Sequence, residues 1–395
     1  MFRIDLLDGG VGEVPGFSCQ GVNCGLRDGT QEDLAFIHSK SDSLISAVYT
    51  SNKFKAAPIV HALRYSKTFL GNFILINAKN ANAMTGQKGV EDIEEILSML
   101  PDELNLKNPV MSSTGVIGYR LPKDKIKSGL AKFDWRAKDS NSLSRAILTT
   151  DKFAKMLRFR VTLKSGESFE IAGVAKGAGM INPSMATMLC FIVTDAKVPA
   201  DEIEEILQEA SAKSFNRISV DGDTSTNDSL FLMSNGKSGV WDKEAFVEAI
   251  NRMTFEFAMM ILRDGEGSNK VVAFEVEGAK NQLEAQKVAT NLSNSLLVKT
   301  ALFGQDPNWG RIASTIGASG VECDEESLKI YYDDLLIYDK DNRELDSKRE
   351  EEAFKIMQKD SFKIRCDLGI GDGKFTAYGC DLSYEYVKIN AEYRT

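Results

Sequence analysis

The chain has 395 residues, and its 48 lysines and arginines against 57 aspartates and glutamates give a net charge of −9. This length exceeds one simple core and predicts two or more subdomains, while 43% hydrophobic and 27% charged residues are typical of a globular protein. The acidic balance disfavours nucleic acid and anionic membranes as partners, and no stretch approaches the ~18 apolar residues of a membrane span.

Cysteine and histidine usage excludes further classes. The six cysteines form no Cys-x-x-Cys pair, and neither of the two histidines lies in an acidic ligand pattern, so we expect neither a metal site nor a disulfide framework. With so few histidines, a Ser–His–Asp or Cys–His mechanism is disfavoured. We expect His38 to pack in a strand and His61 to make surface contacts. Residues 1–10 lack the pattern of a signal peptide, so we expect a cytoplasmic protein.

Strand and helix patterns alternate along the chain. Short apolar runs predict strands, and apolar residues spaced three and four apart predict amphipathic helices. In chain order the pattern predicts strands at 47–50 and 72–77, a helix at 90–100 ended by Pro101, a hairpin of 159–164 and 168–173, helices at 201–207 and 243–263, a strand at 274–277, a helix at 281–298, a strand at 328–332 and a helix at 347–358. This mixture predicts an α/β or α+β architecture with layered sheets and helices.

The segment from Lys176 to Leu189 suggests a nucleophile. It reads Lys-Gly-Ala-Gly-Met-Ile-Asn-Pro-Ser-Met-Ala-Thr-Met-Leu and places Thr187 after a small residue and before an apolar run. A threonine hydroxyl needs a base, and its own α-amine can serve once the bond between Ala186 and Thr187 is cut. A freed α-amine has a pKa of about 7.7–8.0, close enough to neutrality to take the hydroxyl proton. The local pattern by itself favours the other interpretation, a threonine that simply begins a strand.

Further segments are polar and rich in turn residues. They are Ser112-Ser-Thr-Gly-Val-Ile-Gly118, Asp221-Gly-Asp-Thr-Ser-Thr-Asn-Asp228, Arg263-Asp-Gly-Glu-Gly267 and Thr300-Ala-Leu-Phe-Gly-Gln-Asp-Pro-Asn-Trp-Gly-Arg311. The first puts a hydroxyl and flexible backbone in a loop, as hydrogen-bond donation to an oxyanion requires. The glycine-rich stretches 177–179 and 369–373 lack the full dinucleotide-binding layout, so tight turns are the better interpretation.

Taken in this order, these segments resemble the ornithine acetyltransferase family of arginine biosynthesis, also called glutamate N-acetyltransferase. The resemblance runs from Lys55-Ala-Ala-Pro58 and Asn80-Ala-Asn-Ala83 to the C-terminus. It implies a self-processing N-terminal-threonine fold, shared with related aminopeptidases, in which helices sandwich the sheets. It also implies cleavage between Ala186 and Thr187 into an α chain (1–186) and a β chain (187–395), commonly assembled as α2β2.

The resemblance also implies roles for individual residues. Thr187 would be the nucleophile, and Thr114 and Gly115 would form the oxyanion hole. The implied substrate-binding positions are Thr150, Lys176, Thr187, Glu266, Asn390 and Thr395. Lys176 is a compact cation able to hold a carboxylate. Singly, each position has a structural alternative, such as a helix N-cap contact at Thr150 or a frayed terminus at Thr395.

The implied reaction moves acetyl from N-acetylornithine to glutamate through an acetyl-threonine ester. It needs no cofactor, and the sequence leaves open whether acetyl-CoA is a second donor. Departures from the usual family pattern fall at Asn77-Ala-Lys-Asn80, Met84, Pro183-Ser-Met and Ile370, where they bear on substrate preference more than on reaction type. Two rivals stay open: a self-processing amidohydrolase or aminopeptidase, in which water takes the acyl group, and an uncut metabolite-binding protein.

Overall fold

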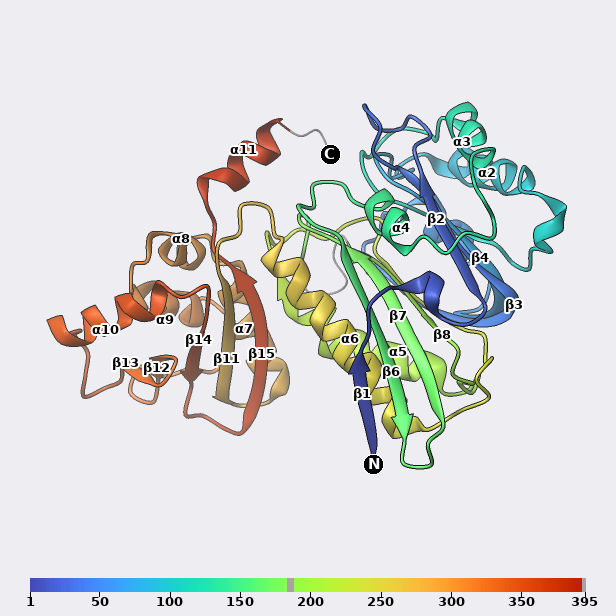
Figure 1. Ribbon diagram of the computed structural model, residues 1–395. Helices are drawn as coiled ribbons and strands as arrows, with labels where there is room; N and C mark the ends of the chain where they lie inside the picture. The colour runs from blue at the N-terminus through green and yellow to red at the C-terminus, as the bar shows by residue number, and fades with distance from the viewer. Residues whose placement is uncertain (183–187, 393–395) are drawn as a thin grey trace.

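The computed structural model describes residues 1–182 and 188–392, which form two lobes, each built on its own β-sheet (Figure 1). The larger lobe has a nine-stranded sheet in the order β1-β6-β7-β8-β10-β3-β4-β5, with β2 paired to β3. Its strands are β1 (Phe2–Leu6), β2 (Phe17–Val22), β3 (Leu34–Tyr49), β4 (Thr68–Asn77), β5 (Val110–Ser113), β6 (Lys155–Leu163), β7 (Ser168–Lys176), β8 (Leu189–Thr194) and β10 (Ser229–Ser234).

The long strand β3 divides this sheet into two facing halves. Its first part pairs with β2 and β4, its second part pairs with β4 and β10, and the register against β4 shifts between His38 and Ser43. Side chains from β2, β3 and β4 meet side chains from β7, β8 and β10 in one buried cluster between the halves. The sheet therefore encloses its own hydrophobic core.

Helices cover the outer face of each half. Helices α5 and α6 pack on the half containing β6, β7, β8 and β10, and α2 and α3 pack on the half containing β3 and β4. The helices of this lobe are α1 (Ala57–Ala62), α2 (Gly86–Ser98), α3 (Lys123–Leu130), α4 (Ser140–Ala146), α5 (Ile203–Lys213) and α6 (Lys243–Arg263). The layers run helix, sheet, sheet, helix, which confirms the predicted architecture of sheets sandwiched by helices.

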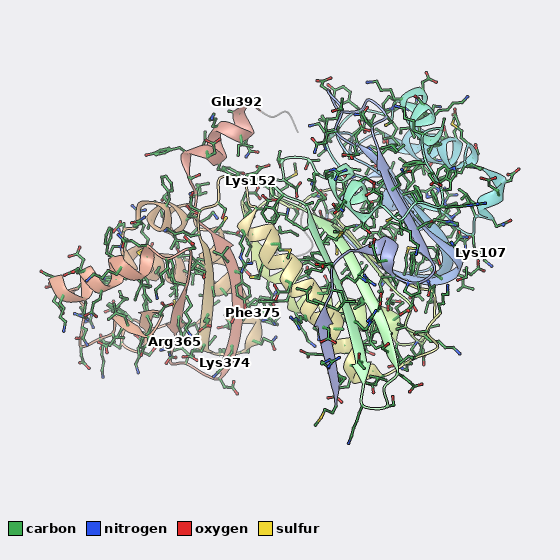
Figure 2. The ribbon with its side chains drawn as sticks, viewed as in Figure 1. Lys107, Lys152, Arg365, Lys374, Phe375 and Glu392 are labelled. Atoms are coloured by element: carbon green, nitrogen blue, oxygen red, sulfur yellow. The ribbon has the colours of Figure 1, made fainter. Side chains whose placement is uncertain are left out.

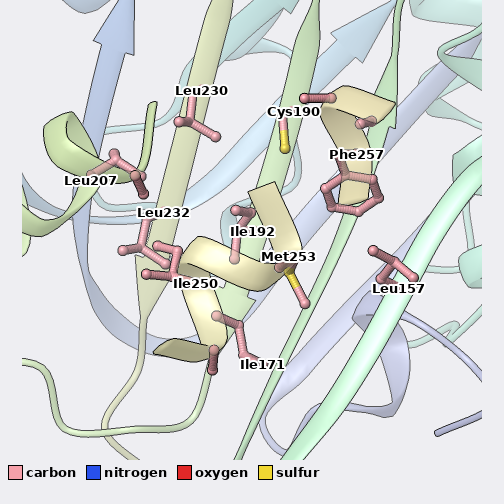
Figure 3. Close-up of a cluster of buried hydrophobic side chains, with 14 of the residues drawn as sticks. Leu157, Ile171, Cys190, Ile192, Leu207, Leu230, Leu232, Ile250, Met253 and Phe257 are labelled. Atoms are coloured by element: carbon pink, nitrogen blue, oxygen red, sulfur yellow. The ribbon is translucent and has the colours of Figure 1, made fainter. Parts of the chain in front are cut away.

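Strands β8 and β10 are buried on both faces. In β8, Cys190 and Ile192 face α6, whereas Phe191 and Val193 face the other half of the sheet. This alternation follows from the two-residue period of a strand. Figure 3 shows Ile192 with Leu230 and Leu232 of β10 close to side chains of α6.

Truncation in this layer is expected to cost substantial stability. Leu232 is fully buried, so Leu232→Ala removes buried methyl groups and leaves a cavity, which costs about 2–5 kcal/mol. The matched control is Leu283→Ala on α7 (Gln282–Asn294), because Leu283 is 76% exposed and should change stability by less than about 0.5 kcal/mol. Urea unfolding followed by circular dichroism measures both. Equal midpoints for the two variants would contradict the packing described here.

The smaller lobe has a six-stranded sheet in the order β13-β12-β14-β11-β15-β9. Its strands are β9 (Ile218–Ser219), β11 (Val271–Ala279), β12 (Lys329–Tyr332), β13 (Leu335–Tyr338), β14 (Ser361–Asp367) and β15 (Gly373–Cys380). One face packs on helices α7 to α10 in a single core. The remaining helix bounds are α8 (Leu296–Gly304), α9 (Trp309–Gly317), α10 (Ser347–Met357) and α11 (Tyr384–Glu392).

Helix α11 leaves the small lobe and extends from it as a separate arm (Figure 1). None of its residues is buried. In Figure 2, Glu392 at the end of α11 and Lys152 in the loop before β6 lie at the same end of the molecule. Within the described ranges, no helix combines the length and apolar character needed to cross a membrane.

Most predicted elements are confirmed, and two expectations are wrong. Helix α6 has the predicted bounds, and His38 lies buried in β3. The helix predicted at 281–298 is two helices, because Ser295 is extended (φ −66°, ψ 115°) and its hydroxyl accepts from the Val298 amide to cap α8. His61, expected at the surface, is only 3% exposed. It belongs to α1, which packs against α2 and β5.

Candidate functional site

A cavity of about 160 Å³ lies where the ends of β5, β7 and α6 meet α11. Its lining residues are Thr114, Gly115, Thr149, Thr150, Lys176, Gly179, Met180, Asp221, Asp223, Glu266, Tyr386 and Asn390. A larger cavity of about 840 Å³ lies between α6 and the small sheet, but none of the predicted site residues lines it. The smaller cavity is therefore the candidate site.

The structure brings six of the predicted residues together in this cavity. They are Thr114, Gly115, Thr150, Lys176, Glu266 and Asn390. The other three predicted residues, Ala186, Thr187 and Thr395, lie outside the described residues. Just after the segment 183–187, Leu189 pairs with Lys176 in the ladder between β7 and β8. The roles assigned to all of these positions stay predictions.

The loop after β5 presents Thr114 and Gly115 to the cavity. Thr114 is 2% exposed, and its amide donates to the carbonyl of Asn77 at 3.0 Å. Gly115 has φ +132°, and a Cβ at this position would lie 2.2 Å from the carbonyl carbon of Lys79. Only glycine fits here, because any side chain would collide with backbone. The close approach fixes the loop at the cavity wall.

Lys176 ends β7 with its ammonium group buried at the cavity. Its Nζ donates to Thr149 Oγ1 at 2.7 Å and reaches Thr114 Oγ1 at 3.4 Å, and the carboxylate of Asp151 lies 3.9 Å away. Burial lowers the pKa of Lys176, and the nearby carboxylates of Asp151 and Glu266 oppose that shift. The cavity thus contains a cation that is only partly neutralised by its surroundings.

Glu266 lies opposite, just beyond the end of α6. It is 6% exposed, its amide donates to the Ala178 carbonyl at 2.9 Å, and its carboxylate accepts from Asn390 Nδ2 at 2.7 Å. A Cβ on Gly179 would lie 2.5 Å from Glu266 Oε2, so this glycine makes room for the carboxylate. The contact with Asn390 holds the exposed helix α11 over the cavity.

Three aspartates of the polar loop 221–228 lie at or near the site, although their roles were not predicted, and two of them, Asp221 and Asp223, line the cavity. Asp221 accepts from the amides of Met180 and Ile181 at 2.6 and 2.9 Å, and burial raises its pKa to about 6. Asp228 accepts from the Met188 amide at 2.9 Å, and burial raises its pKa well above the usual range. Their place in a dense polar loop was the available sequence signal.

Gly179 belongs to the glycine-rich stretch 177–179, for which the sequence predicted tight turns. Thr149 and Tyr386 carried no sequence signal. Thr149 accepts from Lys176, and Tyr386 Oη donates to Asp221 Oδ2 at 3.3 Å. Each acquires its place from tertiary contacts between segments distant in sequence. Among the described residues, no group of three or more His, Cys, Asp or Glu side chains could hold a metal ion.

Comparison with known proteins places the chain in a family. The model of the ArgJ family matches residues 18–395. The chain belongs to the ArgJ family. It is 55% identical over 396 residues to the arginine biosynthesis bifunctional protein ArgJ of Wolinella succinogenes, and the match covers 100% of both chains. This membership confirms the resemblance found in the sequence.

Two solved structures of named family proteins match parts of the chain. The arginine biosynthesis bifunctional protein ArgJ of Bacillus halodurans is 40% identical, with 51% of this chain and 98% of that chain covered at a TM-score of 0.48. The ornithine acetyltransferase of Mycobacterium tuberculosis, solved in complex with ornithine, is 28% identical, with 46% and 99% covered at a TM-score of 0.41.

Proposed function

We propose that this ArgJ protein is an acetyltransferase of arginine biosynthesis that moves an acetyl group from N-acetylornithine to glutamate. Its full-length identity of 55% to a bifunctional ArgJ protein carries this conclusion. The cavity adds chemical support, because it places a cation, a carboxylate and hydroxyl groups within reach of one small molecule. The second activity of a bifunctional enzyme is the N-acetylation of glutamate from acetyl-CoA.

The nucleophile in this proposal is Thr187, freed as an N-terminus by cleavage after Ala186. Thr187 lies two residues before Leu189, which pairs with Lys176 at the cavity wall. In this proposal Thr187 acts at the cavity that Lys176 lines. Its α-amine accepts the hydroxyl proton while Oγ1 attacks the acetyl carbonyl of N-acetylornithine.

The tetrahedral intermediate carries its negative charge near Thr114 and Gly115, which act as the oxyanion hole. The C–N bond then breaks, the departing amine of ornithine takes the proton from the Thr187 amine, and an acetyl-threonine ester remains. The amine of glutamate attacks this ester through a second tetrahedral intermediate and leaves as N-acetylglutamate. Thr187 regains its proton, so the cycle closes without a cofactor.

The other cavity residues bind and orient the amino acid. The Lys176 ammonium is suited to a substrate carboxylate, and Glu266 is suited to an amine. Thr150 and Asn390 supply hydrogen bonds, and Thr395 completes the set of substrate-binding positions in this proposal. Substrates with both a carboxylate and an amine match the pairing of opposite charges in the cavity.

An assay that separates transfer to glutamate from transfer to water tests the proposal. Purified protein given N-acetylornithine and glutamate should form ornithine and N-acetylglutamate in equal amounts, with little acetate. An amidohydrolase would instead accumulate acetate whether or not glutamate is present. An uncut binding protein would form neither product. A second arm with acetyl-CoA in place of N-acetylornithine measures the further activity.

We also propose that residues 1–186 and 187–395 remain associated as α and β chains in an α2β2 assembly in the cytoplasm. All six cysteines are free thiols, as is usual in a reducing compartment. Intact mass of each chain together with the native mass of the complex measures both the cut and the assembly.

A further inference from the structure

A row of buried charges runs from behind the cavity to Lys176, and its other three members have no part in the mechanism above. Asp264, Lys155, Asp151 and Lys176 follow one another with alternating sign. Lys155 Nζ contacts Asp264 Oδ2 at 2.5 Å and Asp151 Oδ1 at 2.8 Å, and Asp151 Oδ2 lies 3.9 Å from Lys176 Nζ. The side chains of the first three are fully buried, and that of Lys176 is 2% exposed.

Lys155 connects its own strand, β6, with two segments that carry cavity residues. It begins β6, whereas Asp264 directly follows α6 and lies two residues before Glu266. Asp151 belongs to the loop that carries Thr149 and Thr150. Backbone amides fix both carboxylates, since Gly177 and Thr149 donate to Asp151 and Lys152 donates to Asp264.

Stability alone does not account for this row. A buried ion pair is often no more stabilising than apolar side chains of similar volume, because the charges lose their hydration. The row determines which of two lysines, Lys155 or Lys176, lies closer to the carboxylate of Asp151. Its carboxylate lies more than 1 Å nearer to Lys155 than to Lys176, so the Lys176 ammonium keeps its hydrogen bonds to the hydroxyls of the cavity.

We propose that Lys155 is a positioning residue for the substrate site: by binding Asp151 and Asp264 together, it keeps Asp151 from closing onto Lys176. The Lys176 ammonium then has no close ion pair with Asp151 and is available to the substrate carboxylate. The inference rests on the proposed function and deepens it. The low pKa of Asp151, about 2, agrees with this arrangement, since burial would raise it and the charges of Lys176 and Lys155 outweigh that effect.

The experiment compares Lys155→Met with the double variant Lys155→Met/Asp151→Asn. In the single variant, Asp151 has Lys176 as its nearest remaining cation and closes onto it. KM for N-acetylornithine and for glutamate is expected to rise at least ten-fold, with kcat within three-fold of wild type. In the double variant the neutral amide no longer attracts Lys176, so KM should return to within three-fold of wild type.

Lys299→Met is the matched control, because Lys299 is another buried lysine, 1% exposed, whose Nζ contacts the Cys380 carbonyl in the small lobe. Its KM should stay within two-fold. The proposal is overturned if the double variant has a KM as high as the single variant, or if Lys299→Met raises KM equally. If Lys155→Met does not fold, the double variant is measured alone, and a KM more than three-fold above wild type overturns the proposal. A wild-type enzyme without transfer would refute the proposed function instead.

Discussion

Replacing Thr187 by alanine is expected to leave the protein as one uncut chain without acetyl transfer. The substitution removes the hydroxyl that attacks the preceding peptide bond, so no new N-terminus forms. It also removes the oxygen that would carry the acetyl group. A denaturing gel should show a single full-length band, whereas the wild type should give two bands for residues 1–186 and 187–395. Loss of activity should reach the background of the assay.

Thr194→Ala is the matched control for this experiment. Thr194 is a fully buried threonine at the end of β8, the strand that follows Thr187, and its hydroxyl donates to the Glu170 carbonyl at 2.7 Å. Losing that hydrogen bond costs stability of about 1 kcal/mol but leaves the nucleophile in place. This variant should be cut. Two bands from Thr187→Ala itself would disprove self-cleavage by this residue.

The sequence predicted which residues gather at the cavity better than it predicted the shape of the sheet. Thr114, Lys176 and Glu266 lie in blocks whose order along the chain resembles one family, and the structure brings these residues into one cavity. Their distances could not be predicted, because each follows a different element and the contacts depend on how those elements pack. A motif in the sequence identifies the residues of a candidate site, whereas the distances between them follow only from the fold.

Strand β3 shows why the sheet was only partly predicted. Residues 47–50 were predicted as a short strand, yet β3 begins at Leu34. The polar residues Lys40, Ser41 and Asp42 interrupt the apolar pattern. A prediction based on the spacing of apolar residues therefore ends a strand there. In the fold they lie where the register against β4 shifts, at the point where the sheet passes from one half to the other.

Lys155 and Ser295 show two other limits. Lys155 lies at the start of a strand, where a lysine is ordinarily exposed. It is buried because it pairs with Asp151, four residues earlier, and with Asp264, far away in the sequence. Ser295 interrupts a good helical pattern by capping the next helix with its own hydroxyl. A local pattern cannot distinguish such a serine from one on the solvent face of a continuous helix.

Replacing Thr114 by alanine is the second substitution with a large expected effect. Lys176 Nζ lies 3.4 Å from Thr114 Oγ1 and is positioned to donate to it. Since the hydroxyl accepts from Lys176, its own proton is free for the oxyanion. Removing one such donor costs about 2.7–4 kcal/mol, or about 10²–10³ in kcat. Single-turnover transfer from N-acetylornithine measures the chemical step.

Ser113→Ala is the control for Thr114→Ala, because the neighbouring Ser113 hydroxyl donates to Asn77 Oδ1 at 2.6 Å and Ser113 does not line the cavity. Its kcat should stay within a few-fold of wild type. If one oxyanion hole serves both chemical steps, Thr114→Ala should also mature slowly, which a time course of chain cleavage follows. Slow transfer with normal maturation would mean that the two steps use different donors. Normal rates for both would remove Thr114 from the oxyanion hole and leave the backbone amide of Gly115, held against Lys79 by its positive φ, as the donor to test next.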